Sequence, residues 1–276
     1  MTTSAPRNRN AVELRPDSVI KKFHHGNRGA CEREWRALSL LASYAPGLAP
    51  VPHRTDLTAE EPVVVMSRVP GGPMRGEPLG DRQLGAMAAA VTELYAAVPA
   101  DVLAGVPVRP GRQRHLIDQI HTWTPRIRPR VGGEVGEAMD RGLEWLARSG
   151  LEGEGAGGQS EVPPVFGPGD GNLANYLWDG TRVRIVDFED SGLSDRPFEL
   201  AEITEHVASW AGPPFDVDAF LGLFDLHPAE RVRLPKCRRL LALVWLFLLS
   251  SDDPRHPRNP PGTAERQAAR LSALLA

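Results

Sequence analysis

The chain has 276 residues, of which 41% are hydrophobic and 24% are charged, with a formal net charge of −3. These are ordinary values for a folded globular protein, and they leave no basic stripe of the kind that a nucleic-acid binder needs. Cys31 and Cys237 are too few for a disulfide framework, and the longest apolar run, 240–249, is shorter than the ~20 residues of a membrane helix. We therefore expect a cytoplasmic protein with neither a nucleic-acid nor a membrane partner.

The first seventy residues predict a small β-rich lobe with one helix. Residues 11–23 contain two β-like runs separated by Pro16-Asp17, which favours a tight turn and hence a hairpin. Apolar side chains recur at helical spacing in 31–43, and the run 62–66 (PVVVM) is typical of a strand that is buried on both faces.

A Pro- and Gly-rich break at 69–74 marks the expected boundary between two lobes, at 1–69 and 70–276. The second lobe is expected to be larger and mainly helical, with one β-hairpin. Its clearest amphipathic helices are 81–97 and 138–148, and the apolar run 240–249 is expected to be a core helix. The Gly-rich segment 153–164 is expected to be a mobile surface loop. The predicted fold class is therefore α+β and bilobal.

A second hairpin is predicted in the segment that carries most of the polar signals. Two strand-like runs, 175–178 and 181–187, are separated by Asp179-Gly180, a dipeptide that favours a two-residue hairpin loop with positive φ at both positions. This pairing is expected to bring Asn175 and Asp187 side by side.

Asp170 lies five residues before Asn175, in a Gly-rich loop that can bring it to the same place. Magnesium prefers oxygen ligands and commonly takes one or two carboxylates together with phosphate oxygens and water. Asn175 and Asp187 suit that role. Phosphoryl transfer also needs a carboxylate that orients the acceptor hydroxyl, and Asp170 suits that one.

The same residues carry a family resemblance. The pattern resembles the catalytic core of the aminoglycoside phosphotransferase and choline kinase family, loosely over residues 11–250, in Asp170-x-x-x-x-Asn175, Val186-Asp187-Phe188-Glu189 and Ser194-Asp195. The resemblance implies the bilobal protein-kinase-like fold, Asp170 as the catalytic base, and Asn175 and Asp187 as holders of Mg²⁺. It also implies that the strand 62–66 leads into a nucleotide hinge, where backbone groups of Ser67 and Val69 meet the base.

Kinases of this type also use a strand lysine that touches the nucleotide phosphates and pairs with a helix glutamate. Of two candidate glutamates, Glu34 lies on the apolar face of the predicted helix and Glu32 points to its polar side. Lys21 and Lys22 alternate across the strand, and the pattern itself does not separate them. The family pattern, two apolar residues and then the lysine, favours Lys21.

Two departures from the family pattern affect the prediction. Pro168 stands where the family usually has a histidine, and proline offers no imidazole hydrogen bonds. Few residues precede the first predicted strand, so residues 4–10 are expected to form a shortened phosphate-covering loop, with lower nucleotide affinity, or else the true start lies upstream. These departures favour the alternative of a kinase-like binding protein that has lost catalysis.

Two further patterns allow more than one interpretation. Seven carboxylates between Asp187 and Glu205, against the single Arg196, suit either a cationic acceptor or a metal site with solvated helix faces. The histidines lack ligand spacing and are expected at the surface or in packing, and His206 is one of them.

The predicted function is Mg²⁺-dependent transfer of the γ-phosphate of ATP, or of GTP, to a hydroxyl of a small molecule such as an aminoglycoside-like antibiotic or an amino alcohol. A protein kinase is disfavoured, because the segment between Asp187 and Glu199 is too short for an activation loop.

Overall fold

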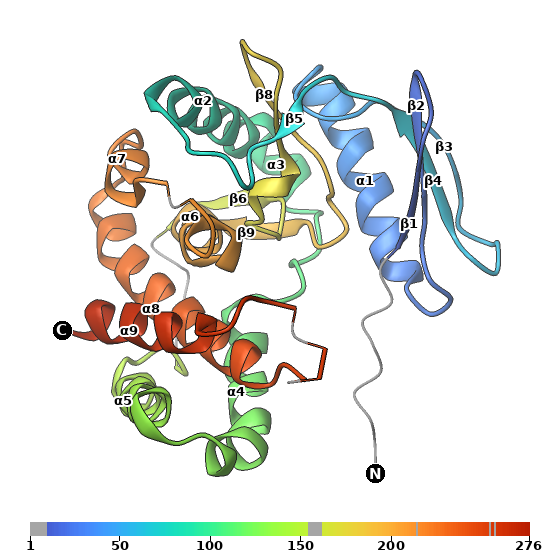
Figure 1. Ribbon diagram of the computed structural model, residues 1–276. Coiled ribbons are helices and arrows are strands. Elements are labelled where there is room, and N and C mark those ends of the chain that lie inside the picture. Colours follow the sequence, from blue (N-terminus) through green and yellow to red (C-terminus); the bar gives the residue numbers. More distant parts are fainter. Residues whose placement is uncertain (1–9, 154–161, 214, 254, 257) are drawn as a thin grey trace.

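The computed structural model describes residues 10–153, 162–213, 215–253, 255–256 and 258–276. It has a small β-rich lobe at one end and a larger, mainly helical lobe at the other (Figure 1). The predicted fold class is thus confirmed.

The small lobe is a four-stranded antiparallel sheet with one helix beside it (Figure 1). The sheet has the order β1-β2-β4-β3. Its elements are β1 (Ala11–Leu14), β2 (Ser18–Lys22), α1 (Arg28–Tyr44), β3 (Pro52–Asp56) and β4 (Val63–Ser67). The apolar run of β4 is central because it pairs on both sides, with β2 and with β3. The predicted hairpin at 11–23 and the predicted buried strand are both present. The polar strand β3 was not predicted, since its sequence, PHRTD, has no apolar alternation.

The larger lobe holds two small sheets among helices. One sheet has the order β5-β7-β8 and the other pairs β6 with β9. The strands are β5 (Gly72–Pro73), β6 (Pro164–Gly167), β7 (Tyr176–Trp178), β8 (Val183–Ile185) and β9 (Gly192–Asp195). The α-helices are α2 (Asp81–Ala97), α3 (Ala100–Leu103), α4 (Gln113–Ile127), α5 (Gly133–Arg148), α6 (Arg196–Glu205), α7 (Val217–Leu221), α8 (Pro228–Ser250) and α9 (Thr263–Leu275). Short 3₁₀ turns lie at η1 (Arg128–Arg130), η2 (Leu173–Asn175) and η3 (Val207–Ser209).

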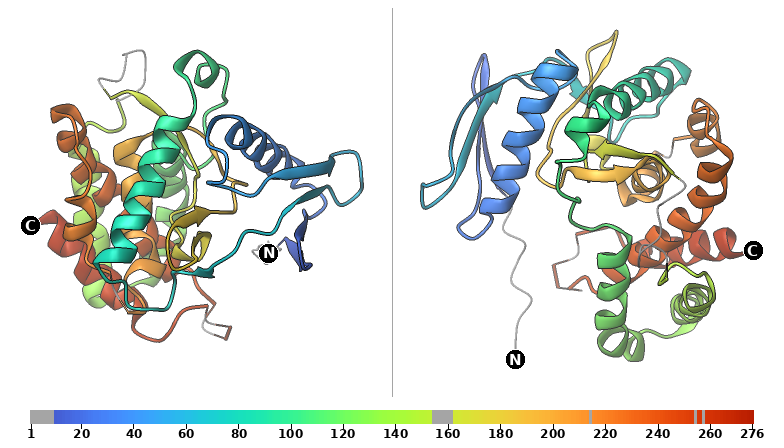
Figure 2. Two further views of the ribbon diagram at one scale, coloured as in Figure 1. Left: turned by 90° about the horizontal axis from the view of Figure 1, so that it is seen from above. Right: turned by 180° about the vertical axis from the view of Figure 1, so that it is seen from behind.

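Helix α8 is the centre of the helical lobe. It packs against α4, α5, α6 and α9, and these helices lie around it in both views of Figure 2. The predicted core helix 240–249 is its C-terminal part, where most side chains are buried. None of the described helices combines the length and the apolar character needed to span a membrane.

Part of the predicted loop at 153–164 belongs to ordered structure. Residues 154–161 lie outside the described residues, whereas Val162 is buried and Pro164 begins β6. The correction has a simple reason: Pro164 occupies the first position of a strand, where a missing N–H is tolerated.

Two helical glycines give a matched test of packing in this lobe. A Cβ at Gly142 in α5 would meet Leu243 Cδ1 at 2.7 Å, whereas a Cβ at Gly85 in α2 would meet nothing within 4 Å. We expect Gly142→Ala to lower the free energy of unfolding by about 1–3 kcal/mol because it overpacks the α5–α8 contact. Gly85→Ala should raise it by about 0.5–1 kcal/mol, since alanine favours a helix over glycine. Urea unfolding of both variants measures these changes. Equal changes in the free energy of unfolding would contradict the close α5–α8 contact at Gly142.

Candidate active site

The hairpin that carries Asn175 and Asp187 has a longer loop than predicted. Trp178 pairs with Val183, so four residues form the loop instead of Asp179-Gly180 alone. Gly180 has φ 97°, but Asp179 does not have the expected positive φ. Instead, the Asp179 carboxylate accepts hydrogen bonds from the backbone N–H groups of Thr181 and Arg182, at 2.8 and 2.9 Å. This side-chain cap stabilises the wider turn.

The wider turn changes the register in a way that matters for the site. A two-residue loop would pair Trp178 with Thr181 and thus set Asn175 opposite Arg184. In the observed register, Tyr176 pairs with Ile185, and the Val186 N–H donates to the Asn175 carbonyl at 2.9 Å. Asn175 is the last residue of η2, and its backbone partner Val186 directly precedes Asp187. The two residues come together, as predicted, but through a different turn.

Asp170 is joined to Asn175 by a direct side-chain contact. The Asn175 Nδ2 donates to Asp170 Oδ2 at 3.1 Å, and the backbone N–H of Asn172 donates to Asp170 Oδ1 at 2.9 Å. Partial burial raises the pKa of the Asp170 carboxyl, and the charge of Asp187 adds to this effect. The three residues predicted to carry the chemistry thus form one continuous cluster.

Gly169 allows the loop before Asp170 to pass very close to a neighbouring segment. Its φ is +90°, and a Cβ at this position would lie 2.1 Å from the Asp190 carbonyl oxygen. Only glycine fits such an approach with this backbone conformation. The loop that contains Asp170 is therefore packed directly against the turn that follows Asp187.

A buried ion pair, which was not predicted, binds both the N–H and the C=O group of Gly169. Arg109 Nη1 lies 2.7 Å from Glu199 Oε1, and Arg109 Nη2 donates to the Gly169 carbonyl at 2.6 Å. The Gly169 N–H in turn donates to Glu199 Oε2 at 3.3 Å. Arg109 and Glu199 are 4% and 1% exposed, so the contact lies in a protein interior where charge-assisted hydrogen bonds are strong. Arg109 comes from a Pro-rich segment with no periodicity, and thus gave no signal in the sequence.

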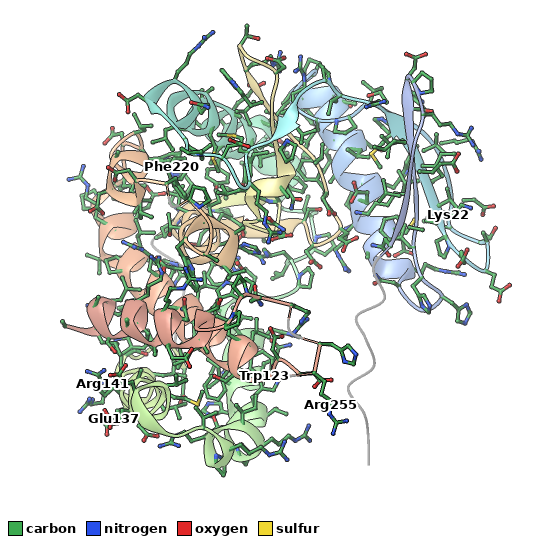
Figure 3. All side chains as sticks on the ribbon, viewed as in Figure 1. Lys22, Trp123, Glu137, Arg141, Phe220 and Arg255 are labelled. Carbon is green, nitrogen blue, oxygen red and sulfur yellow. The ribbon has the colours of Figure 1, made fainter. Side chains whose placement is uncertain are left out.

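Lys21 is the lysine that faces the site. Its Nζ lies 3.0 Å from Glu34 Oε2 and 2.5 Å from Asp187 Oδ1. Burial works against the ammonium charge of Lys21, but the surrounding carboxylates outweigh it and raise the pKa of Lys21. Burial also raises the pKa of Glu34 to about 7. Lys22 is exposed and lies on the side of the sheet away from α1 (Figure 3), and Glu32 is exposed as well.

Glu34 links the two lobes. Its Oε2 accepts from Lys21 in β2 and also from the backbone N–H of Phe188 at 2.9 Å, so one carboxylate oxygen contacts both the sheet and the segment after Asp187. Asp187 itself has φ 67°, the single positive value among the described non-glycine residues. Strained backbone of this kind is concentrated at functional sites.

Glu189 is a further carboxylate at the site. Its Oε2 lies 2.9 Å from Lys21 Nζ, and it also accepts from the side chain of Asn10. Glu189 is part of the motif that carries the family resemblance, but no role was predicted for it. Its spacing of two residues from Asp187 was the available signal.

The predicted hinge residues lie at the end of β4. The Ser67 N–H donates to the Val51 carbonyl at 2.8 Å, so its carbonyl oxygen is the backbone group available to a nucleotide base. Arg68 donates its N–H to Asp17, and within the described residues the Val69 N–H has no backbone acceptor. Among the turn and loop hydrogen bonds of the described residues, none involves the Ser67 carbonyl or the Val69 N–H, which lie two residues apart at this edge.

The acidic residues from Asp187 to Glu205 divide into two groups. Those on and around α6 are neutralised by arginines from other elements: Asp195 by Arg112 and Arg233, Glu199 and Glu202 by Arg109, and Glu205 by Arg238 and Arg270. Asp187, Glu189 and Asp190 lie around Asp170, where Lys21 pairs with the first two and Arg33 lies 3.7 Å from Asp190. The acidity of α6 therefore reflects buried ion pairs, an explanation that neither sequence-based interpretation included.

The oxygen atoms at Asn175 and Asp187 fit a magnesium ion that is held jointly with phosphate. The Asn175 Nδ2 is committed to Asp170, which leaves its Oδ1 as a ligand oxygen, and the Asp187 side chain is 39% exposed. Within the described part of the chain, no group of three or more His, Cys, Asp or Glu side chains has metal-binding geometry. Two protein oxygens completed by phosphate and water are the usual magnesium arrangement.

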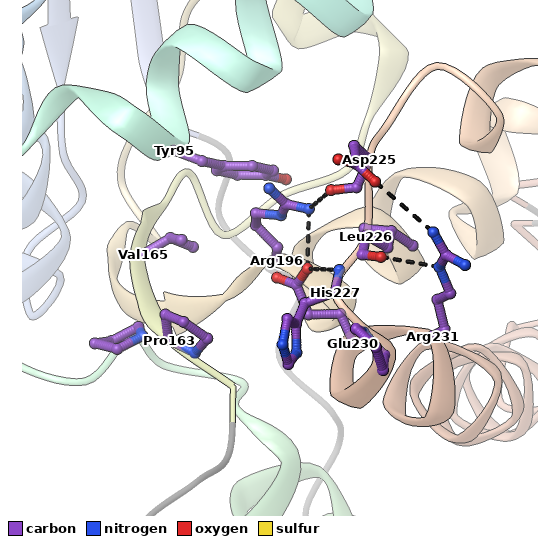
Figure 4. A pocket seen from close by; sticks show the side chains of 11 residues that line it. Tyr95, Pro163, Val165, Arg196, Asp225, Leu226, His227, Glu230 and Arg231 are labelled. Carbon is purple, nitrogen blue, oxygen red and sulfur yellow. Dashed lines mark hydrogen bonds and ion pairs between the residues drawn. The ribbon is translucent and has the colours of Figure 1, made fainter.

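A separate pocket of about 630 Å³ is lined by residues at the start of β6 and by Arg196, which directly follows β9 (Figure 4). Arg196 lies in it and is already paired, with the Asp225 carbonyl at 2.6 Å and Glu230 Oε2 at 2.9 Å. The lining contains none of the predicted site residues. This pocket is therefore distinct from the cluster around Asp170.

Comparisons with solved structures place the fold among small-molecule kinases. A choline/ethanolamine kinase family protein from Mesorhizobium loti is 19% identical, with a TM-score of 0.66, over 99% of this chain and 88% of that one. The choline kinase LicA from Streptococcus pneumoniae is 14% identical, with a TM-score of 0.61, over 99% of this chain and 91% of that one. Aminoglycoside phosphotransferase APH(4)-Ia is 16% identical, with a TM-score of 0.59, over 97% and 93%. No curated protein matches the sequence.

The family model of the phosphotransferase enzyme family matches residues 8–233. This match spans most of the chain and includes all seven predicted site residues. The protein therefore belongs to the phosphotransferase enzyme family (APH), in agreement with the resemblance found in its sequence.

Proposed function

We propose that this phosphotransferase moves the γ-phosphate of ATP, or of GTP, to a hydroxyl of a small molecule. The observation that carries the proposal is the contact chain from Asp170 through Asn175 to Asp187 and Lys21, since phosphoryl transfer needs an acceptor-orienting carboxylate, metal ligands and a phosphate cation in one place. Related folds are described with ADP bound and with GDP and kanamycin bound, which supports a nucleotide donor.

In this mechanism Asp170 accepts a hydrogen bond from the acceptor hydroxyl and orients its oxygen toward the γ-phosphorus. Asn175 and Asp187 would hold Mg²⁺, which would supply positive charge to neutralise the phosphate oxygens. Lys21, held by Glu34, contacts the nucleotide phosphates once it exchanges its contact with Asp187 for them. The Ser67 carbonyl and the Val69 N–H meet the base. The proposed lobe boundary lies just after this hinge, between residues 69 and 70.

Acceptors of the aminoglycoside or amino-alcohol type suit the site, because Asp187, Glu189 and Asp190 leave an excess of negative charge beside Asp170. Burial raises the pKa of Asp190, Arg109 and Arg33 oppose this effect, and the nearby Asp170 and Asp187 add to it. A cationic acceptor relieves this repulsion. Antibiotic inactivation is one physiological role of such a reaction.

The first prediction about the proposed function concerns Asp170. We expect Asp170→Asn to lower kcat by about 10²–10⁴-fold, because the amide does not accept the hydroxyl proton, and to leave nucleotide binding nearly unchanged. The measurements are ADP release with Mg²⁺ across a panel of aminoglycosides, choline and amino alcohols, and the thermal shift with ATP. If the wild type turns over no ATP with any acceptor of the panel and shows little or no thermal shift with ATP, the binding-protein alternative replaces the enzyme.

The second prediction uses neighbouring lysines as a matched pair. Lys21→Met should raise the KM for ATP or lower kcat by at least about 10-fold, since a phosphate contact of the ammonium group is lost. Lys22→Met changes the charge by the same amount on the exposed face of β2 and should leave both constants within about twofold. Similar losses in both variants would contradict the assignment of Lys21.

The third prediction concerns the metal. Asp187→Asn should raise the Mg²⁺ concentration for half-maximal activity by about 10-fold or more, because a charged ligand is replaced by a neutral one. Chelation with EDTA should abolish turnover in the wild type, and added Mg²⁺ should restore it. Wild-type turnover that persists in EDTA would refute the proposed magnesium dependence.

A further inference from the structure

His206 lies beside Asp170, although 36 positions separate them in the sequence. It follows the last residue of α6 and precedes η3, and its Nε2 lies 3.6 Å from Asp170 Oδ1. Its side chain is 11% exposed. The ring therefore reaches the candidate catalytic carboxylate from a different element of the fold.

The hydrogen bonds of the ring fix which nitrogen carries the proton. The Ala208 N–H donates to His206 Nδ1 at 3.0 Å, so Nδ1 must be unprotonated. Burial, together with the charge of Arg75, lowers the pKa of His206 to about 3, which keeps the ring neutral. A neutral imidazole with a bare Nδ1 carries its proton on Nε2. The N–H group is thus on the nitrogen that faces Asp170.

Packing holds the ring in this orientation. The imidazole makes an edge-to-face contact with Trp245, with 4.7 Å between ring centroids and 79° between planes. The backbone of His206 is fixed as well, since its N–H donates to Glu202 and its carbonyl accepts from Ser209. The direction of the Nε2–H bond is therefore set before any substrate binds.

We propose that His206 is a positioning residue for Asp170: its Nε2–H becomes a third donor to the carboxylate when an acceptor binds, and so fixes the oxygen that meets the hydroxyl. The proposal rests on the proposed function. The present 3.6 Å is longer than a formed hydrogen bond, and such bonds are often long in unliganded sites and tighten in the substrate complex.

The need for a third donor follows from the two that are already present. The Asn172 N–H and the Asn175 Nδ2 each bind one Asp170 oxygen. Once Asn175 shares its other side-chain atom with a metal ion, its hold on the carboxylate depends on the metal geometry. The loop itself, with Pro168 before Asp170, contributes no imidazole. His206 supplies a donor that does not depend on the loop or the metal.

Two substitutions separate a positioning role from a purely structural one. Asn at position 206 places its Oδ1 where Nδ1 lies and keeps the cap on Ala208, but it does not reach Asp170. Gln places its Nε2 near the histidine Nε2 and restores a donor, but it caps poorly. A structural role predicts that His206→Asn is near normal and that His206→Gln is impaired. A positioning role predicts the reverse order.

The kinetic test uses hydrolysis of Mg·ATP, with water in the place of the acceptor. We expect His206→Asn to lower kcat about 10- to 100-fold with the KM for ATP within twofold, as displacement of a reacting group does, and His206→Gln to recover part of the loss. Thermal unfolding of each variant, with the ATP-induced shift, shows whether the fold and nucleotide site persist. A kcat within twofold of wild type for folded His206→Asn would overturn the proposal.

A second arm does not depend on turnover. In ¹⁵N spectra of the wild-type protein, His206, assigned by its loss in His206→Asn, should show a protonated Nε2 and a bare Nδ1 at pH 5–8. The Asp170→Asn substitution should shift its Nε2 resonance. A proton on Nδ1, or no shift, would overturn the proposal even if the enzyme is active. Absence of ATP turnover in the wild type would instead count against the proposed function.

Discussion

The buried contact of Arg109 with Glu199 and Gly169 is the constraint on which the candidate site depends. One guanidinium and one carboxylate together satisfy both peptide groups of a glycine that sits immediately before Asp170. Gly169 is pressed against the Asp190 carbonyl, where no other residue fits. The backbone that precedes Asp170 is therefore held by the interior of the helical lobe, while Asn172 and Asn175 hold the Asp170 carboxylate itself.

This arrangement holds the loop that contains Pro168 through contacts from elsewhere in the fold. Where the family usually has a histidine in the loop, this chain fixes the loop with an arginine from the segment before α4 and with a glutamate from α6. His206, at the end of the same helix, brings an imidazole to Asp170 from the other side. Residues from both ends of α6 thus lie against the loop: Glu199 in the first turn binds Gly169, and His206 at the C-terminal cap lies beside Asp170. The negative charge of α6 is mostly balanced by arginines inside the protein.

Lys21 and Glu34 connect the small lobe to the segment around Asp187, next to Asp170. Glu34 contacts the backbone after Asp187, and Lys21 contacts three carboxylates, those of Glu34, Asp187 and Glu189. Without phosphate, the ammonium group is thus neutralised by the residues proposed to surround the nucleotide. In the proposed function, nucleotide phosphates would replace the carboxylate partners of Lys21, and Mg²⁺ would balance the charge of Asp187. The two lobes are in this way coupled through electrostatics at one point.

The sequence alone was sufficient for the family, the bilobal architecture, the buried face of α1 and the cluster of Asp170, Asn175 and Asp187. These follow from local patterns, namely apolar periodicity and a short motif, whereas the hairpin dipeptide predicted the hairpin but not its turn or register. The choice of Lys21 over Lys22 needed the family pattern, because alternation along a strand does not show which face is covered.

Tertiary structure decided the rest. The hairpin register depends on a carboxylate cap at Asp179, which widened the turn by two residues and set Asn175 beside Val186 instead of Arg184. Arg109 and His206 reach the loop from positions about 60 and 36 residues away in the chain, and neither lies in a motif. Local patterns record which side chains share a face, but they do not record which distant side chain meets a given backbone group. That depends on how the helices of the larger lobe pack around α6.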